Sequence, residues 1–403
     1  MLLVSIAPYA APVAGAPKVN RAWLECLRDS GFHCRALSLN PVAPMFQADE
    51  RRRKQIDDAG REPVAAFEGA PGLRLFIDDR IESLEADSPD ILLDALDEQL
   101  RAWEPSWVLL SSEEKPGYPI VRQVHAAVGR RFVYLANTPQ VFPFGPASLS
   151  PDPAATEAIR AGTVVAVCRT MAEYIETHAG MPANMLSPPV FGDGPFTDLG
   201  AFDTGYVTMV NPSSIKGVSI FLALAQRLTS VSFACVPSWA TSTEDMRAIA
   251  AAPNIDVLPP YADVEDVLRD TKVLVAPSLW RQEGFGLVVI EAMLRGIPVV
   301  ASDSGGLTEA KMGVDYVLPV NTIEDYAETK KTTRIISPSA AVVPPQNIEP
   351  WVDALQKLLT NRDHYEHVSR QSAAAARNYH RNIDREALGR LIRHRTIELS
   401  KTA

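Results

Sequence analysis

Cysteine is scarce in this sequence, with four residues among 403, and their spacing is unlike the paired spacing of zinc or redox sites. Each cysteine lies in or beside an apolar segment, which predicts four buried thiols in a reducing cytoplasm; they are Cys26, Cys34, Cys168 and Cys235. No apolar run reaches the ~18 residues that a membrane span needs, and the N-terminus carries no basic leader. We therefore expect a cytoplasmic protein without membrane contact, whose first residues form a strand.

Positive charge is also in short supply. Lysine and arginine total 39 against 49 aspartates and glutamates, which gives a formal net charge of −10. This balance argues against a nucleic-acid partner, because phosphate backbones require basic surfaces. One local basic run, 51–54, has acidic residues on both sides, and we interpret it as a solvated helix face.

Short apolar segments alternate with amphipathic ones almost throughout the chain. The apolar segments predict strands at Leu2–Ala7, Cys34–Leu39, Leu73–Ile77, Trp107–Ser111, Phe132–Leu135, Val164–Val167, Tyr206–Val210, Ser232–Val236, Ile255–Leu258, Val273–Ala276, Val299–Ala301 and Tyr316–Leu318. Amphipathic segments between them predict helices, among them Val19–Arg28, Ile91–Trp103, Val218–Leu228 and Leu287–Arg295. Apolar strands that are each followed by a helix indicate an α/β fold with doubly wound, Rossmann-like parallel sheets.

A chain of 403 residues exceeds one ordinary core, so we expect two domains. The linker candidate is the proline- and glycine-rich stretch 187–196, which separates a first domain, 1–190, from a second, 191–384. The last helix, 385–403, would cross back to the first domain. Ligands of doubly wound sheets bind beyond the carboxyl ends of the strands, so two such domains should face each other across a cleft that both line.

The most informative segment is 277–306. It predicts a buried strand ending at Ser278, a loop that holds Glu283, and a helix that opens at glycines and carries Glu291. Free backbone N–H groups and the helix dipole attract phosphate to a helix N-terminus. Because carboxylates accept hydrogen bonds from hydroxyls, two acids that straddle such a terminus favour a ligand with a diphosphate between two polyhydroxylated rings. A nucleotide-sugar is such a ligand.

This segment, continued by Gly305-Gly306, resembles the retaining glycosyltransferases of family four, which have the two-domain GT-B architecture. The resemblance implies that Glu283 contacts sugar hydroxyls and is a catalytic residue, and that Glu291 binds the nucleotide ribose. It also implies that the diphosphate is bound by backbone amides of Gly284, Phe285, Gly286 and Leu287. The first domain would then be the acceptor side and the second the donor side.

Lys216-Gly217 follows the predicted strand at 206–210 and opens a helix. A lysine there can reach a diphosphate as a point charge, and the glycine allows close backbone approach. We therefore count Lys216 among the donor-binding and catalytic residues. The family often has an arginine where this chain has Asn211, and Arg281 is a candidate substitute for that charge.

In the first domain, Gly15 and Ala16 match the family loop that approaches the diphosphate. This loop lacks the Gly-x-Gly-x-x-Gly fingerprint, which argues against a nicotinamide dehydrogenase. Asn137 occupies the position where the family commonly carries a histidine near the reacting sugar carbon, and it is the third predicted catalytic residue. An asparagine can hydrogen-bond a hydroxyl but cannot take a proton at neutral pH, so an acid–base role does not transfer.

Glu113 and Glu114 follow another predicted strand, where a carboxylate could orient an acceptor hydroxyl or be simply solvated. No Asp-x-Asp with apolar flanks is present, so no metal or other cofactor is expected. The partners expected are a nucleotide-sugar donor and a hydroxyl-bearing acceptor. The predicted function is retaining sugar transfer; a nucleotide-sugar epimerase of the same fold and a non-catalytic sugar-nucleotide-binding protein are the alternatives.

Overall fold

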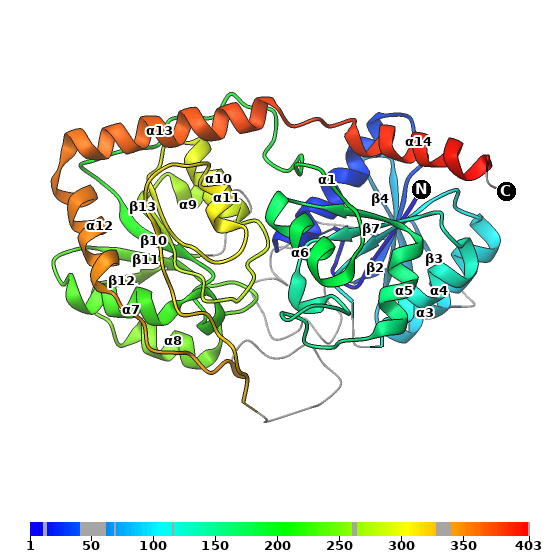
Figure 1. The fold of residues 1–403 in the computed structure, drawn as a ribbon, viewed down its shortest axis with the longest axis horizontal. Helices are drawn as coiled ribbons and strands as arrows, with labels where there is room; N and C mark the ends of the chain where they lie inside the picture. Colours follow the sequence, from blue (N-terminus) through cyan, green and yellow to red (C-terminus); the bar gives the residue numbers. More distant parts are fainter. Residues whose placement is uncertain are drawn as a thin grey trace. The chain divides into compact units, whose positions relative to one another are not determined.

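The computed structural model describes residues 1–10, 14–40, 62–67, 70–114, 117–259, 264–327 and 340–401. The chain divides into two compact units (Figure 1): unit 1 is Met1–Val190 with Ile383–Ala403, and unit 2 is Phe191–Asn382. The basic run at 51–54 lies outside the described residues. Among the helices of the described residues, none combines the length and the apolar character that crossing a membrane requires.

Unit 1 is built on a nine-stranded sheet in the order β3-β4-β5-β2-β1-β6-β7-β8-β9. Its strands are β1 (Leu2–Ser5), β2 (Arg35–Leu39), β3 (Ala65–Ala66), β4 (Leu73–Asp78), β5 (Ile81–Ala86), β6 (Val108–Ser111), β7 (Phe132–Ala136), β8 (Thr163–Ala166) and β9 (Ala183–Met185). Its helices are α1 (Gly15–Asp29), α3 (Pro89–Glu98, continued by the π-helical turn Gln99–Trp103), α4 (Pro119–Val128), α5 (Pro153–Ala161), α6 (Arg169–Ala179) and α14 (Ala387–Ser400). The central strands are fully buried, as expected of a sheet covered on both faces.

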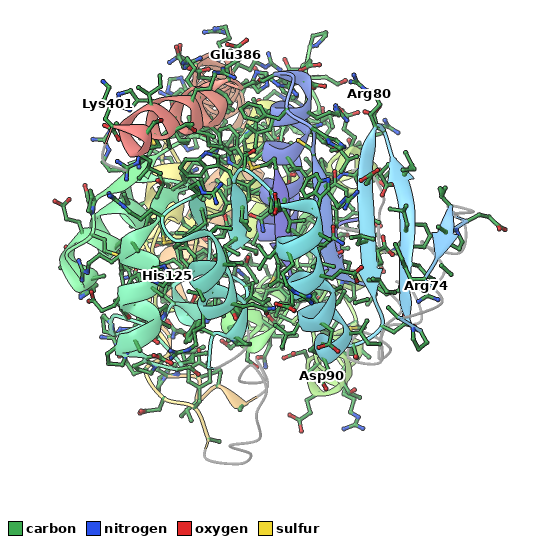
Figure 2. The ribbon with its side chains drawn as sticks, turned by 90° about the vertical axis from the view of Figure 1, so that its right-hand side faces the viewer. Arg74, Arg80, Asp90, His125, Glu386 and Lys401 are labelled. Atoms are coloured by element: carbon green, nitrogen blue, oxygen red, sulfur yellow. The ribbon has the colours of Figure 1, made fainter. Side chains whose placement is uncertain are left out.

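One edge of this sheet corrects the expectation of parallel strands throughout. Strands β4 and β5 form an antiparallel hairpin, and β5 then pairs in parallel with β2. The turn residues Asp79 and Arg80 have φ values of 42° and 67°, the left-handed conformation that a tight hairpin needs. Figure 2 shows Arg80 at the tip of the hairpin.

Unit 2 has a six-stranded sheet, parallel throughout, in the order β12-β11-β10-β13-β14-β15. The strands are β10 (Tyr206–Val210), β11 (Phe233–Val236), β12 (Ile255–Val257), β13 (Thr271–Ala276), β14 (Val299–Ser302) and β15 (Val317–Leu318). The helices are α7 (Val218–Arg227), α8 (Thr243–Ala250), α9 (Val264–Leu268), α10 (Leu287–Leu294), α11 (Leu307–Ala310), α12 (Glu349–Thr360) and α13 (Arg362–Arg381). With the parallel sheets and their covering helices, the predicted α/β fold of Rossmann-like units is confirmed.

Helix α14 belongs to unit 1, although it follows unit 2 in the sequence. Its residues Leu388 and Ile392 are buried, and the Trp107 indole N–H donates a 2.8 Å hydrogen bond to the Thr396 hydroxyl. Figure 2 shows Glu386 and Lys401 at the two ends of this helix. The four cysteines are buried and free, which confirms the prediction of buried thiols.

Candidate functional site

The carboxyl ends of β10 and β13 carry two loops of unit 2 that pack directly on each other. The first is the 3-10 turn Ser214–Lys216, followed by Gly217 in the left-handed conformation at φ 83°. A Cβ atom at Gly217 would lie 1.9 Å from the Pro277 carbonyl oxygen, so only glycine permits this approach. The Leu279 N–H donates a 3.0 Å hydrogen bond to the Ile215 carbonyl. Backbone contacts therefore fix the position of Lys216, which lies between Ile215 and Gly217.

Lys216 and Glu283 form an ion pair in which the ammonium lies 2.6 Å from both carboxylate oxygens. Their side chains are 19% and 11% exposed, respectively. The Ser278 hydroxyl donates a further 2.6 Å hydrogen bond to Glu283 Oε2. The structure thus brings together two of the predicted catalytic residues and adds a serine that the sequence analysis did not select as a ligand of the carboxylate.

The charge state of Glu283 follows from these contacts. Burial by itself would raise the pKa of the carboxyl group. The Lys216 ammonium, the Ser278 hydroxyl and the Gly284 backbone N–H all favour the carboxylate, and together they lower the pKa below its ordinary value. Glu283 is therefore an anion at neutral pH, held in place to accept hydrogen bonds.

Helix α10 begins beside this pair. Gly286 is its N-terminal cap residue, with φ 78°, and a Cβ atom there would lie 2.4 Å from Leu307 Cδ2. The loop that leads into the helix rests on Gly306, whose N–H donates a 3.0 Å hydrogen bond to the Glu283 carbonyl. A Cβ at Gly306 would lie 2.0 Å from the Gly284 carbonyl oxygen. Residues 305–306 thus support the predicted amide loop from behind.

The remaining predicted donor contacts lie on α10 and in the loop that leads into it. Phe285 is buried, with its ring 5.9 Å from that of Tyr379 on α13, so its side chain holds the loop to the unit. Glu291 is buried at 8% exposure within a helix whose other residues are all apolar. Carboxylates are rarely buried in such surroundings unless they are paired or hydrogen-bonded. Its position on α10, after Leu287, matches the layout that the sequence predicts.

Two positions differ from the expected distribution of positive charge. Arg281 does not point a free guanidinium at the site, because it forms a 2.7 Å ion pair with Glu324. Asn211 has φ 61°, a conformation that asparagine tolerates, and its carbonyl oxygen accepts hydrogen bonds from the Ala240 N–H (3.2 Å) and the Thr241 hydroxyl (3.4 Å). Asn211 therefore links the end of β10 to the loop that follows β11.

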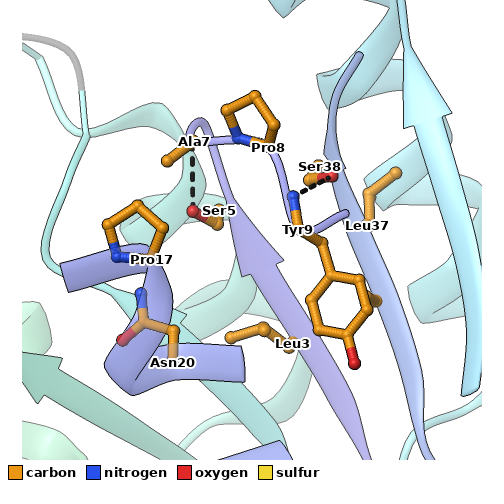
Figure 3. A pocket seen from close by; sticks show the side chains of 10 residues that line it. Leu3, Ser5, Ala7, Pro8, Tyr9, Pro17, Asn20, Leu37 and Ser38 are labelled. Atoms are coloured by element: carbon orange, nitrogen blue, oxygen red, sulfur yellow. Dashed lines mark hydrogen bonds between the residues drawn. The ribbon is translucent and has the colours of Figure 1, made fainter. Parts of the chain in front are cut away.

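In unit 1, Gly15 and Ala16 form the first turn of α1. Its cap residue, Ala14, offers no side-chain hydrogen bond to the first N–H groups of the helix, and the first turn contains no acid. Figure 3 shows a small pocket beside this turn, lined by Pro17 and Asn20 of α1 together with Ser5, Ala7, Tyr9, Ser38 and neighbouring apolar residues. The pocket adjoins the end of β1, the sheet edge at which doubly wound folds bind ligands.

Asn137, at the end of β7, belongs to a buried polar network. Its Nδ2 donates a 3.0 Å hydrogen bond to Asn20 Oδ1, and Asn20 Nδ2 donates a 2.8 Å bond to the Ser111 hydroxyl. Asn137 is 6% exposed, and its Oδ1 accepts no hydrogen bond from any described residue. An acceptor of this kind is costly to leave unsatisfied, so the amide is oriented with one acceptor available to an added hydroxyl group or water molecule.

Glu113 and Glu114 have different roles. The Glu113 carboxylate accepts hydrogen bonds from the Ser111 and Thr138 hydroxyls at 2.5 Å and 2.7 Å, so it braces the ends of β6 and β7. Glu114 is buried, and its carboxylate accepts hydrogen bonds from the Ile120 and Val121 N–H groups at the start of α4. Glu114 therefore caps a helix, which corrects the idea that it is a solvated or acceptor-facing acid.

Sequence reasoning missed an aromatic pair in unit 2. Trp280 lies in the loop after β13, with the Lys216 ammonium 4.9 Å from its ring centroid. Trp239, in the loop after β11, packs against it with the centroids 6.0 Å apart. The available signal was the presence of a tryptophan just beyond each of two strands of the same predicted sheet.

Comparison with known proteins bears on this same unit. Residues 202–361 match the family described as "Glycosyl transferases group 1". The match covers 160 of the 403 residues. The match includes Lys216, Glu283 and Glu291.

The alpha-1,3/1,6-mannosyltransferase alg-2 of Neurospora crassa is 43% identical over 75 residues, which cover 17% of this chain and 15% of that protein. The four curated relatives are each matched over less than a third of their own length.

Solved structures extend the likeness to both units. Sucrose-phosphate synthase from Thermosynechococcus elongatus aligns with a TM-score of 0.66 and 14% identity, covering 100% of this chain and 99% of that one. Anabaena HepE in complex with UDP-glucose aligns with a TM-score of 0.63 and 16% identity, covering 98% and 99%. At such identities the likeness establishes the fold alone, which is the GT-B fold with two Rossmann-like domains.

Proposed function

We propose that this protein is a glycosyltransferase that moves a sugar from a nucleoside-diphosphate sugar to an acceptor hydroxyl. The observation that carries the proposal is the Lys216–Glu283 pair, held at 2.6 Å beside the N-terminus of α10. A cation and free backbone N–H groups suit a diphosphate, and an oriented carboxylate suits sugar hydroxyls. The group 1 domain match over the same residues supports this assignment.

The proposed roles follow the layout of unit 2. The diphosphate would lie against the amides of Gly284–Leu287, where the dipole of α10 favours negative charge. Lys216 carries three N–H donors, of which Glu283 occupies two, and it would supply the positive charge. Glu291 would bind the ribose. Unit 2 is then the donor side and unit 1 the acceptor side; Gly15 and Ala16 of unit 1 stay predicted donor-binding residues, and Asn137 stays a predicted catalytic residue.

We further propose that the reaction retains the anomeric configuration, as in family four, and needs no metal. Leaving-group charge would be stabilised by Lys216 and by the amides of the α10 terminus, a preorganised electrostatic effect. The transferred sugar is proposed to be a hexose: one relative is named a mannosyltransferase, and one structural neighbour is described in complex with UDP-glucose. The four free, buried thiols fit a reducing cytoplasm.

The test begins with binding. Calorimetry with UDP, GDP and ADP should show a submillimolar complex with at least one of them, and the matching nucleotide-sugars are then incubated with the protein in EDTA. The proposal of sugar transfer is supported if the release of nucleoside diphosphate accelerates when sugar or polyol acceptors are added. Retention is supported if an axial donor gives a product whose linkage is axial by NMR. Conversion of the donor to its epimer would instead show an epimerase, and binding without consumption would show a non-catalytic protein.

A further inference from the structure

The aromatic pair Trp239 and Trp280 has no place in the proposed donor contacts so far. Trp239 is 41% exposed, an unusual state for the largest apolar side chain, whereas Trp280 is half-buried. The two ring centroids lie 6.0 Å apart with their planes tilted by 45°. Both residues follow strands of the same parallel sheet at its carboxyl edge, β11 and β13. An aromatic surface is therefore presented where this fold binds ligands.

The pair is contiguous with the proposed phosphate anchor. The Lys216 ammonium lies 4.9 Å from the centroid of the Trp280 ring, and the centroid of the Trp239 ring lies 6.0 Å from that of Trp280. The Ser304 hydroxyl donates a hydrogen bond to the Trp280 carbonyl. Trp280 is thus fixed between a cation on one side and an exposed ring on the other.

The segment that directly follows Trp239 is held by hydrogen bonds. Asn211 accepts hydrogen bonds from Ala240 and Thr241, immediately after the tryptophan. Helix α8 then begins with a reciprocal capping box, in which Ser242 and Asp245 each bond the other's backbone N–H. An exposed ring on such a fixed loop loses little conformational freedom when a ligand covers it.

We propose that Trp239 stacks on the base of the bound nucleotide, with Trp280 supporting it and Asn211 as a positioning residue. This rests on the proposed function, because it takes Lys216 as the phosphate anchor. A nucleotide has phosphate at one end and an aromatic ring at the other, which matches the order Lys216, Trp280, Trp239 within one unit. Every base has a π-face, so stacking of this kind binds nucleotides with little regard to base identity.

The decisive comparison is between nucleoside diphosphate and inorganic pyrophosphate, both measured by calorimetry on the full chain. Pyrophosphate has the anchor group but no base. For Trp239→Ala, we expect the Kd of the best-binding nucleoside diphosphate to rise roughly tenfold, since base stacking on an aromatic ring is of that order, while the Kd of pyrophosphate stays unchanged. Trp239→Phe should recover much of the loss. Ile77→Ala, which truncates an apolar side chain 50% exposed in unit 1, is the control and should change neither value.

Asn211→Gly tests the positioning residue. Glycine keeps the left-handed backbone at this site but removes the carboxamide that holds the loop. We expect the affinity for nucleoside diphosphate to fall less than it does for Trp239→Ala, and the affinity for pyrophosphate to stay unchanged. A residue that merely stabilised the fold would weaken both ligands together.

Several outcomes would overturn the proposal. If Trp239→Ala leaves nucleoside diphosphate affinity unchanged, the ring does not meet the base; a raised KM for the acceptor alone would assign it to the acceptor. If nucleoside diphosphate and pyrophosphate weaken equally, the ring only maintains the loop. Failure of the wild-type chain to bind either ligand would defeat the proposed function itself, which separates the two failures.

Discussion

The Lys216 ammonium and the Glu283 carboxylate lie 2.6 Å apart in two contacts, although 67 residues separate them in the sequence. They are brought together because Gly217 lets its loop pack against the Pro277 carbonyl and because Gly305 and Gly306 let the next loop pack behind Glu283. Without a ligand the lysine is neutralised by the carboxylate. A bound diphosphate would therefore compete with Glu283 for the same ammonium group.

Replacing the lysine tests its role as phosphate anchor. For Lys216→Met we expect nucleoside diphosphate affinity to fall about ten- to a hundredfold, the usual loss when a charge-assisted hydrogen bond is removed. Lys272→Met is the matched control, because Lys272 packs over the Phe202 ring near the amino end of β13. Calorimetry of both variants measures the nucleoside diphosphate affinity. Equal losses of affinity in the two variants, or no loss for Lys216→Met, would contradict the role of Lys216 as phosphate anchor.

Replacing the carboxylate should separate binding from turnover. Glu283→Gln removes the negative charge that competes for Lys216, so nucleoside diphosphate should bind at least as tightly as to the wild type. Turnover of the nucleotide-sugar should nevertheless fall by a factor of about a hundred or more, as when an electrostatic contact to the reacting group is lost. A variant that binds nucleoside diphosphate more weakly, or turns over at the wild-type rate, would be inconsistent with these roles.

The same pair predicts a pH dependence of stability. The pKa of Glu283 is lowered from its ordinary 4.5, so its contribution is present above that pH and is lost as the pH falls through the folded-state pKa. Glu283→Gln should cost about 2 kcal/mol at pH 7, and the difference from wild type should shrink in acid. Urea unfolding at pH 7 and near pH 3 measures this; a constant difference would show that the carboxylate charge is not involved.

Lys311 provides an independent prediction. It is fully buried, donates a 2.5 Å hydrogen bond to the Val299 carbonyl, and burial lowers its pKa to about 7. The unfolded chain then binds more protons than the folded one between that value and the ordinary 10.5, so stability should rise with pH across this window.

The variant Lys311→Met should abolish this rise and gain on the order of 2 kcal/mol at pH 7, because no charge then has to be buried or neutralised. Lys357→Met, which alters an exposed lysine on α12, is the control and should retain the wild-type slope. Thermal or urea unfolding between pH 7 and 10 gives the result. Equal slopes for the wild type and for Lys311→Met across this range would show that Lys311 is charged and otherwise compensated.

Asn137 should influence turnover and not nucleotide binding. Its Oδ1 accepts no hydrogen bond from the described residues, whereas its Nδ2 is held by Asn20. For Asn137→Leu we expect kcat to fall about tenfold or more, the effect of losing one hydrogen bond to the reacting sugar, with nucleoside diphosphate affinity unchanged. Asn184→Leu, on the edge strand β9, is the control; equal kcat losses in both variants would argue against a role for Asn137 at the sugar.

Much of the fold could be predicted because most strands are apolar throughout. Strand β5 was missed because Glu82 and Glu85 interrupt its apolar pattern. In the structure Glu82 pairs with Arg35 on the neighbouring strand, and Glu85 is 1% exposed on a strand near the sheet edge. A charge partner on another strand is invisible to local periodicity, so the hairpin and its antiparallel pairing could not be inferred.

The candidate site, like the fold, could be predicted only in part. The roles expected of Glu283 and Glu291 came from the resemblance of segment 277–306 to a known family, and that of Lys216 from its place at a helix start; all three stay predictions. The lysine–carboxylate pair, the helix cap formed by Glu114 and the link from Asn211 to the Trp239 loop all depend on contacts between distant segments. These contacts require the packing of glycine-containing loops, which spacing alone does not specify.

The most direct test is a crystal structure of the full chain with a bound nucleoside diphosphate, chosen by calorimetry. Density for the two phosphates within hydrogen-bonding distance of Lys216 Nζ and the first amides of α10 is the expected result. Well-defined nucleotide density anywhere else on the chain, with the Lys216–Glu283 contact undisturbed and the α10 terminus unoccupied, would contradict the proposed donor site.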